Sequence, residues 1–181
     1  MTSKFILACL SLVLGCASAL TQAAQAIPAG ATYEVGFSPN AGALDAVLKV
    51  IRSAKSQILV AAYSFTSKPV AKALLDAQER GVKVYVVADE KANSKEYSAA
   101  TFLANQGVPV RLNGNYAIFH HKFIVADGVN LELGSFNYSA AAADKNAENV
   151  LVLWNAKPIA DDFSREWKSL WDGAAPLARK Y

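Results

Sequence analysis

Four polar residues whose side chains suit phosphate chemistry lie in one short stretch of the chain: His120, Lys122, Ser135 and Asn137. Side chains two positions apart on a strand share a face, so His120 and Lys122 are expected to project together, with His121 on the opposite face. Ser135 and Asn137 form a second such pair if the following strand ends beside the first. Converging in this way, the imidazole would attack phosphorus while the ammonium, hydroxyl and amide hold the oxygens on which charge develops.

These residues are part of a longer pattern, H-x-K-x4-D-x6-G-S-x-N, which also contains Asp127 and Gly134. The pattern resembles the signature of the phospholipase D superfamily. The whole chain is similar to the small secreted bacterial endonucleases of that superfamily. A chance match at all six positions is expected only about a few times in a million for a chain of this length. The resemblance therefore leads the interpretation of the sequence.

The resemblance implies a role for each site residue. His120 would be the nucleophile that forms a phosphohistidine, Lys122 and Asn137 would bind the phosphate oxygens, and Ser135 would assist them. Glu148 would accept a hydrogen bond from the far nitrogen of His120 and so fix its tautomer. Without the resemblance, Ser135 and Asn137 would equally suit a turn and a helix N-cap, and Glu148 a solvated strand position.

The superfamily reaction uses two motif histidines, one as nucleophile and one as the acid that protonates the leaving group. This sequence has two histidines in total, and no second H-x-K is present. They are adjacent, His120 and His121, and strand alternation turns them apart. The second motif histidine is therefore expected from a second copy of the chain across a two-fold axis, which predicts a homodimer. The resemblance further implies a structural role for Asp127 and Gly134, and neither a metal nor another cofactor.

The first 26 residues have the features of a cleaved signal peptide. Lys4 provides the positive charge, residues 5–14 form an apolar run, and Ala24-Gln25-Ala26 is an A-x-A cleavage site. The run is too short to cross a bilayer. We therefore predict a periplasmic or secreted protein with one domain over residues 27–181 and no stable membrane association. An alternative is lipoprotein processing, in which the protein is anchored through Cys16.

Charge and cysteine content restrict the partners only weakly. Both cysteines lie in the predicted signal peptide, so the mature chain would have no disulfide and no cysteine metal site. Removing Lys4 from the 18 basic residues leaves 17 against 15 acidic ones, a net charge of +2. This charge permits a polyanionic partner but does not by itself indicate one.

Strands and helices first alternate and then give way to consecutive strands. The pair Asp127-Gly128 between two of these strands is a strong hairpin signal. This order predicts an α/β fold, a mixed sheet flanked by helices on both faces, with one motif per chain. The expected strands are 32–37, 57–63, 82–88, 108–112, 122–126, 131–134 and 149–154. The expected helices are 43–53, 67–80, 94–106, 139–143 and 159–171.

Three functions are compatible with this signature. The leading hypothesis is a metal-independent, sequence-nonspecific endonuclease that cleaves DNA, with RNA as a further candidate substrate. The alternative is a phospholipase D or phosphatidyl transferase that acts on phospholipid. Such an enzyme would be expected to carry a membrane-surface helix, and no segment sets a basic face clearly against an apolar one. A DNA-binding module with an inactive site is disfavoured because every signature position is intact.

Overall fold

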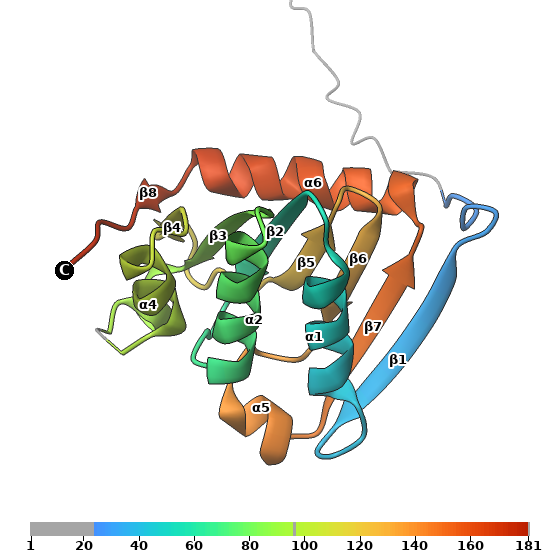
Figure 1. The fold of residues 1–181 in the computed structure, drawn as a ribbon, viewed down its shortest axis with the longest axis horizontal. Helices are drawn as coiled ribbons and strands as arrows, with labels where there is room; N and C mark the ends of the chain where they lie inside the picture. The colour runs from blue at the N-terminus through green and yellow to red at the C-terminus, as the bar shows by residue number, and fades with distance from the viewer. Residues whose placement is uncertain (1–23, 96, 181) are drawn as a thin grey trace, which may run out of the picture.

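Eight strands form one mixed sheet in the order β1-β7-β6-β5-β2-β3-β4-β8 (Figure 1). The structure is a computed structural model, and it describes residues 24–95 and 97–180. The predicted signal peptide, residues 1–26, therefore falls almost entirely outside the described residues. The mixed sheet confirms the predicted fold class.

The strands are β1 (Thr32–Ser38), β2 (Gln57–Ala62), β3 (Lys83–Asp89), β4 (Val110–Asn113), β5 (Lys122–Ala126), β6 (Asn130–Gly134), β7 (Glu148–Trp154) and β8 (Ala175–Pro176). The helices are α1 (Ala43–Ser53), α2 (Lys68–Glu79), α3 (Glu90–Asn93), α4 (Ala99–Asn105), α5 (Ala140–Asp144) and α6 (Lys157–Asp172). Strands β2, β3 and β4 are parallel neighbours, whereas every other pairing is antiparallel.

Helices cover both faces of the sheet, as predicted. On one face, α1, α2, α4 and α5 pack on the larger of two apolar cores, while α6 covers the smaller core on the other face. Figure 1 shows α6 running along the sheet by itself. Its Trp167 is buried and donates its indole N–H to the carbonyl of Val60, at 2.9 Å. Because both faces are covered, β2 can be apolar along almost its whole length.

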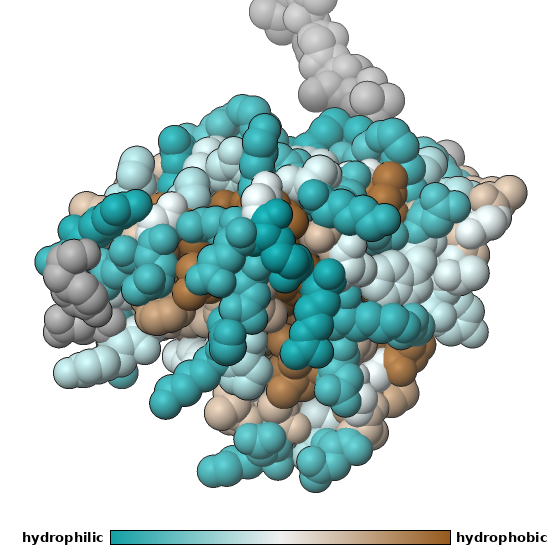
Figure 2. Space-filling model, viewed as in Figure 1, coloured by the Kyte–Doolittle hydropathy of each residue, from teal (hydrophilic) through white to brown (hydrophobic). Residues whose placement is uncertain are grey.

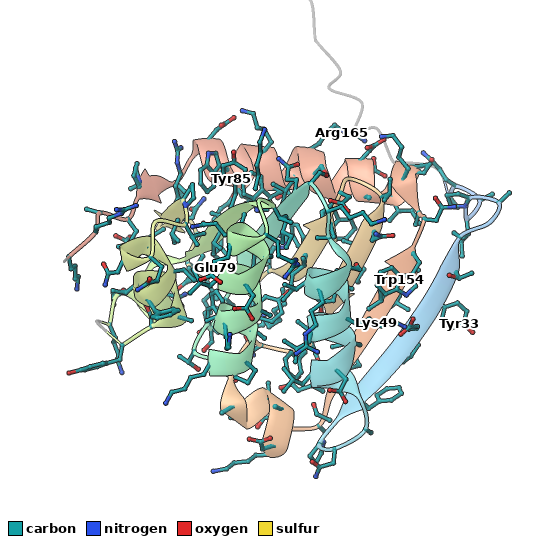
Figure 3. All side chains as sticks on the ribbon, in the orientation of Figure 1. Tyr33, Lys49, Glu79, Tyr85, Trp154 and Arg165 are labelled. Atoms are coloured by element: carbon teal, nitrogen blue, oxygen red, sulfur yellow. The ribbon has the colours of Figure 1, made fainter. Side chains whose placement is uncertain are left out.

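Polar contacts join the edge strand β1 to its neighbours β7 and α1. The indole N–H of Trp154 on β7 donates to Glu34 on β1, at 3.0 Å, and the Lys49 ammonium of α1 lies 5.6 Å from the Trp154 ring centroid. Figure 3 shows Lys49 and Trp154 close together beside β1, with Tyr33 projecting away. Hydrophilic side chains cover much of the face that carries α1 and α2, and apolar surface shows between them (Figure 2).

The predicted helix over residues 94–106 is wrong in its first part. In the structure α4 begins only at Ala99, and a separate, unpredicted helix, α3, ends at Asn93; each is started by its own capping side chain. The carboxylate of Asp89 accepts the N–H of Ala92 at 2.7 Å, and the hydroxyl of Ser98 accepts the N–H of Thr101 at 3.1 Å. A side-chain acceptor at the first turn satisfies an N–H that has no partner within the helix, so the chain begins α3 and then begins again at α4. The two-residue strand β8 was not predicted either.

The hairpin between β5 and β6 is formed as predicted. Asp127 and Gly128 both have positive φ angles, 56° and 66°, as the tight turns favoured in hairpins require. The Asp127 carboxylate also reaches the start of β2. There it accepts the N–H groups of Lys55, Ser56 and Gln57 at 2.9, 2.8 and 3.0 Å, and the Ser56 hydroxyl at 2.7 Å. The turn is thereby fixed to a strand far away in the sequence.

These contacts determine the ionisation of Asp127. Burial alone would raise the pKa of its carboxyl, but the hydrogen bonds from Gln57, Ser56 and Lys55 together outweigh burial and lower the pKa. The stabilisation is therefore present above the carboxyl pKa of the unfolded chain and is lost as pH falls through the lower pKa of the folded protein.

Replacing Asp127 by asparagine should remove the negative charge and leave the turn intact, because asparagine also tolerates positive φ. We expect Asp127→Asn to lower the free energy of unfolding by about 1–2 kcal/mol at pH 7. The difference from the wild type should shrink at acidic pH. Urea denaturation at pH 7 and pH 3 measures both effects. The control is Asp144→Asn, at the exposed end of α5. Equal stability of the two variants at pH 7 would contradict this role of Asp127.

Candidate active site

The signature residues converge because several strands begin or end at the same end of the sheet. Lys122 is the first residue of β5 and lies opposite Ala62, the last residue of β2. Gly134 ends β6, and Glu148 begins the neighbouring strand β7. In Figure 1, α5 lies beside the end at which β7 begins. The side chains just outside these strand ends therefore share one site.

Lys122 is a buried residue, with 7% of its surface exposed. Its Nζ donates a hydrogen bond of 2.9 Å to the carbonyl of His120 and lies 5.1 Å from the ring centroid of Tyr63. Burial lowers the pKa of Lys122, and the negative charge of Glu148 opposes this effect. A carbonyl and an aromatic face use only part of the capacity of an ammonium with three donors. The group is thus suited to bind an anionic oxygen.

His120 lies at the surface and packs against the same tyrosine. The ring centroids of His120 and Tyr63 are 4.7 Å apart. The residue before it, Phe119, is buried and donates its N–H to a carboxylate oxygen of Asp89 at 2.9 Å. The exposed imidazole is therefore carried on a segment that is fixed from inside. The structure brings His120 and Lys122 together, as strand spacing predicted.

His121 points to the other face of the sheet. Its ring lies 5.5 Å from that of Phe119 and 5.6 Å from that of Phe123, and its Nε2 is 3.7 Å from Glu166 of α6. Burial lowers the pKa of His121 and outweighs the opposing effect of Glu166. The two adjacent histidines thus have different surroundings, and only His120 contacts the ring that also faces Lys122.

Ser135 and Glu148 belong to one hydrogen-bond network. The Ser135 hydroxyl donates to one carboxylate oxygen of Glu148 at 2.6 Å and accepts the N–H of Asn149 at 3.1 Å. The amide of Asn146 donates to the other carboxylate oxygen at 3.0 Å. Within the described residues, no hydrogen bond joins His120 to Glu148. The predicted pairing of these two side chains stays a prediction, and in this chain Glu148 orients Ser135.

Gly134 has a steric role in this network. A Cβ atom at this position would collide with the carbonyl oxygen of Asn149 on β7. Only glycine allows β6 and β7 to approach so closely at the point where the strands end. The same approach lets the N–H of Ser135 reach the Asn149 carbonyl, at 3.1 Å.

Asn137 is held beside the start of α2. The carbonyl of the next residue, Tyr138, accepts the N–H groups of Thr66 and Ser67, both at 2.8 Å. Within the described part of the chain, Asn137 Oδ1 is buried and has no hydrogen-bond partner. A buried polar atom without a partner is uncommon in proteins. At the other end of the amide, Nδ2 is not among the buried unpaired atoms, and its two N–H groups are the donors that could serve a phosphate oxygen.

Two residues of the candidate site were not predicted from the sequence. Tyr63, which contacts both His120 and Lys122, was assigned only to the end of an apolar strand. Asn93 is fully buried; its amide donates to the Tyr63 carbonyl at 2.6 Å and accepts the N–H of Phe65 at 3.1 Å. The only available signal for Tyr63 was its place at the end of a buried strand. Its role depends on the pairing of β2 with β5, which the sequence does not reveal.

Among the residues that the structure describes, no group of three or more His, Cys, Asp or Glu residues is arranged to hold a metal ion. Over the same ranges, no helix is both long enough and apolar enough to cross a membrane.

Comparison with known proteins identifies the family. A family model described as "Cardiolipin synthase, PLD-like domain" matches residues 47–171. The chain is 33% identical to a phospholipase D of Rickettsia bellii over 133 residues, which cover 74% of this chain and 66% of the relative. It is 27% identical to the mitochondrial cardiolipin hydrolase of Mus musculus, over 84% of this chain and 71% of the relative. The match thus spans slightly less than two thirds of the Rickettsia bellii protein.

The solved structures agree with this result. Nuc from Salmonella typhimurium, described as a phospholipase D family member, superimposes with a TM-score of 0.80 at 41% identity, over 82% of this chain and 99% of Nuc. NucT from Helicobacter pylori shares the fold with a TM-score of 0.73 at 24% identity, over 81% of this chain and 99% of NucT. With its family model, its close structural match and its intact signature, this chain belongs to the phospholipase D superfamily.

Proposed function

We propose that this protein is an endonuclease that cleaves DNA phosphodiester bonds without base specificity and without a metal cofactor. The observation that carries the proposal is the arrangement of His120 and Lys122 against the Tyr63 ring, at the strand ends where Ser135 and Asn137 also lie. Superfamily members are phosphodiesterases, so the proposal concerns the substrate and the role of each residue.

The proposed reaction has two steps. An imidazole nitrogen of His120 attacks phosphorus, the bond between phosphorus and the leaving oxygen breaks, and a second imidazole gives that oxygen its proton. The phosphohistidine is then attacked by water, whose proton returns to the second imidazole as the bond to His120 breaks. Lys122 and Asn137 hold the non-bridging oxygens, on which negative charge accumulates in both transition states.

Ser135 and Glu148 support this site in the proposal. The Ser135 hydroxyl lies in the network that also contains Glu148 and Asn149, and it assists in binding a phosphate oxygen. The Glu148 carboxylate would accept a hydrogen bond from a motif imidazole and fix its tautomer once the full site is assembled. Glu148 would then leave Ser135 free to turn its hydroxyl to the phosphate.

The second imidazole is proposed to come from a second copy of the chain. His121 faces α6 and packs between Phe119 and Phe123, so it is badly placed to act with His120 on one phosphate. Two His120 residues related by a two-fold axis would face each other across the substrate. The active form is therefore a homodimer, and each chain contributes half of the catalytic groups.

The substrate assignment rests on similarity. Nuc matches this chain over 99% of its own length at 41% identity, and the sequence resembles the small secreted endonucleases of the superfamily. Phospholipid is the second candidate, because relatives at 27–33% identity are named phospholipase D and mitochondrial cardiolipin hydrolase.

Export is part of the same proposal: residues 1–26 are a cleaved signal peptide, and residues 27–181 are the mature periplasmic or secreted domain. The alternative location is a lipid anchor at Cys16.

A direct comparison of substrates tests the proposal. The mature protein, residues 27–181, is incubated with supercoiled plasmid or with phospholipid vesicles, each with and without excess EDTA. We expect nicked and linear plasmid at the same rate with and without EDTA, because Lys122 and Asn137 rather than a metal bind the phosphate. Hydrolysis of phospholipid alone would favour the second candidate. Plasmid cleavage that EDTA abolishes and Mg²⁺ restores would contradict the metal-free mechanism.

The two histidines should differ sharply in importance. We expect His120→Ala to lower kcat by about a thousandfold or more, as the loss of a nucleophile or acid–base group usually does. His121→Ala should keep kcat within about tenfold of the wild type, since it removes only packing against aromatic rings. Single-turnover plasmid nicking measures both rates, and circular dichroism checks that both variants are folded. Similar losses in the two variants would show that His121 also takes part in the reaction.

A further inference from the structure

One buried carboxyl group near the candidate site has no role in the proposed reaction. Glu132 lies on β6, two residues before Gly134, and none of it is exposed. In register with it are Ile124 on β5 and Val152 on β7, both fully buried. A carboxyl group among apolar side chains is costly to bury unless it is neutral or well hydrogen-bonded.

Glu132 has one hydrogen-bond partner within the described residues. The hydroxyl of Tyr138 donates to its Oε2 at 2.7 Å, while its Oε1 is buried without a partner. Burial raises the pKa of the Glu132 carboxyl to about 8, although the hydrogen bond from Tyr138 opposes the shift. Burial therefore favours the protonated, neutral form of Glu132 at pH 7.

Among residues 24–95 and 97–180, the elements packed around this carboxyl bring no second charge to it. The α1 helix packs on β6 and β7 with the apolar residues Val47, Val50 and Ile51 buried, while its Asp45, Lys49 and Arg52 are exposed. On β5, Lys122 shares a face with Ile124 but directs its ammonium to the His120 carbonyl. On β7, Glu148 is engaged with Ser135 and Asn146. Tyr138 is thus the titratable group that acts on Glu132.

Tyr138 connects this carboxyl to the phosphate-binding segment. Its main-chain carbonyl accepts two N–H groups at the start of α2, and its ring packs edge-on against Phe65, with centroids 5.9 Å apart. The tyrosine is thus fixed at the main chain and at the hydroxyl. Between Gly134 and Tyr138 the chain carries Ser135 and Asn137. A shift of Tyr138 would therefore act on the short main-chain segment that carries these two side chains.

We propose that Glu132 is a positioning residue, whose buried carboxyl acts through the Tyr138 hydroxyl to hold Ser135 and Asn137 in the phosphate-binding arrangement. The proposal rests on the function proposed above. Loss of the Glu132 proton leaves a negative charge among apolar side chains with one hydrogen bond to support it. The segment from Ser135 to Tyr138 then moves so that water can reach the carboxylate, and phosphate binding weakens. The site thereby loses activity reversibly at alkaline pH.

The sign of the effect on stability follows from the raised pKa. Between about pH 4.5 and about pH 8 the folded protein keeps the Glu132 proton while the unfolded chain has lost it. The unfolding equilibrium constant therefore rises with pH in this window, by up to about tenfold per pH unit. Above the window both states are ionised and this contribution no longer changes. A glutamine at this position has no such proton, so this contribution to the pH dependence is absent.

The experiment uses the full mature protein and three variants. Glu132→Gln keeps a neutral side chain that can accept from Tyr138; Tyr138→Phe removes the hydroxyl; Glu79→Gln, at an exposed position on α2, is the matched control. Three quantities are measured from pH 5 to 9.5: unfolding in urea, affinity for inorganic phosphate by calorimetry, and kcat/KM for bis(4-nitrophenyl) phosphate. The ratio of variant to wild type cancels the titration of Lys122 and other shared groups.

For Glu132→Gln we expect unfolding to lose the part of its pH dependence that Glu132 contributes, so that the ratio of the wild-type to the variant unfolding constant rises with pH between about pH 5 and 8. Its kcat/KM relative to the wild type should be constant below about pH 7 and rise above pH 8. For Tyr138→Phe we expect phosphate affinity and kcat/KM to fall about tenfold at pH 7, since the phosphate ligands lose their anchor. A Glu132→Gln variant that follows the wild type in all three profiles would overturn the proposal. So would unchanged phosphate affinity in Tyr138→Phe.

The outcomes separate this proposal from the function on which it rests. If the wild type binds phosphate but does not hydrolyse the diester, the proposed function fails. The phosphate affinity and unfolding profiles still decide the role of Glu132. If hydrolysis is normal but the pH profiles of Glu132→Gln and Glu79→Gln coincide, the positioning role fails while the enzyme assignment stands.

Discussion

The candidate site depends on the burial of one lysine, Lys122, at the end of a sheet. Lys122 starts β5 between β2 and β6, and its charge is supported by the His120 carbonyl and the Tyr63 ring. Burial weakens competition from water and strengthens the attraction of the ammonium for an anion. The arrangement requires β5 to be in register with both neighbours, because a shift by one residue would turn Lys122 to the α6 face. Much of the signature can be understood as a means of fixing that register.

The spacing of the signature matches the geometry of one hairpin. Register pairs Phe123 with Leu133, so that Lys122 stands across from Gly134 at the open end of the hairpin. Asp127 lies at the closed end, where its carboxylate binds the start of β2. The signature thus contains the proposed reacting groups at one end of the hairpin and, at the other end, the residue that binds the turn to β2. Glu132, in the middle of β6, accepts the hydrogen bond of Tyr138 and in our proposal thereby holds the segment that carries Ser135 and Asn137.

The sequence was sufficient to predict what depends on local pattern. The alternation of strands and helices, the Asp127-Gly128 turn and the opposite orientations of His120 and His121 follow from residue spacing and turn chemistry, and the structure has all three. Long-range contacts were not predictable. Tyr63 and Asn93 belong to the site only because β2 pairs with β5 and because a buried amide links two loops. Helix α3 was not predicted, and the start of α4 was placed at residue 94 instead of 99, because the caps Asp89 and Ser98 were not recognised.

We propose that each chain carries half of a phosphotransfer site. The chain has one motif histidine, whereas the reaction needs two, one as nucleophile and one as leaving-group acid. Differently tagged wild-type and His120→Ala chains can be co-expressed, and the mixed dimer isolated through both tags and compared with the wild-type dimer in plasmid nicking. One imidazole cannot serve as both nucleophile and leaving-group acid, so we predict that the mixed dimer has far less than half of the wild-type rate. A rate near half, as expected from one intact independent site out of two, or a fully active monomer in light scattering, would contradict the shared site.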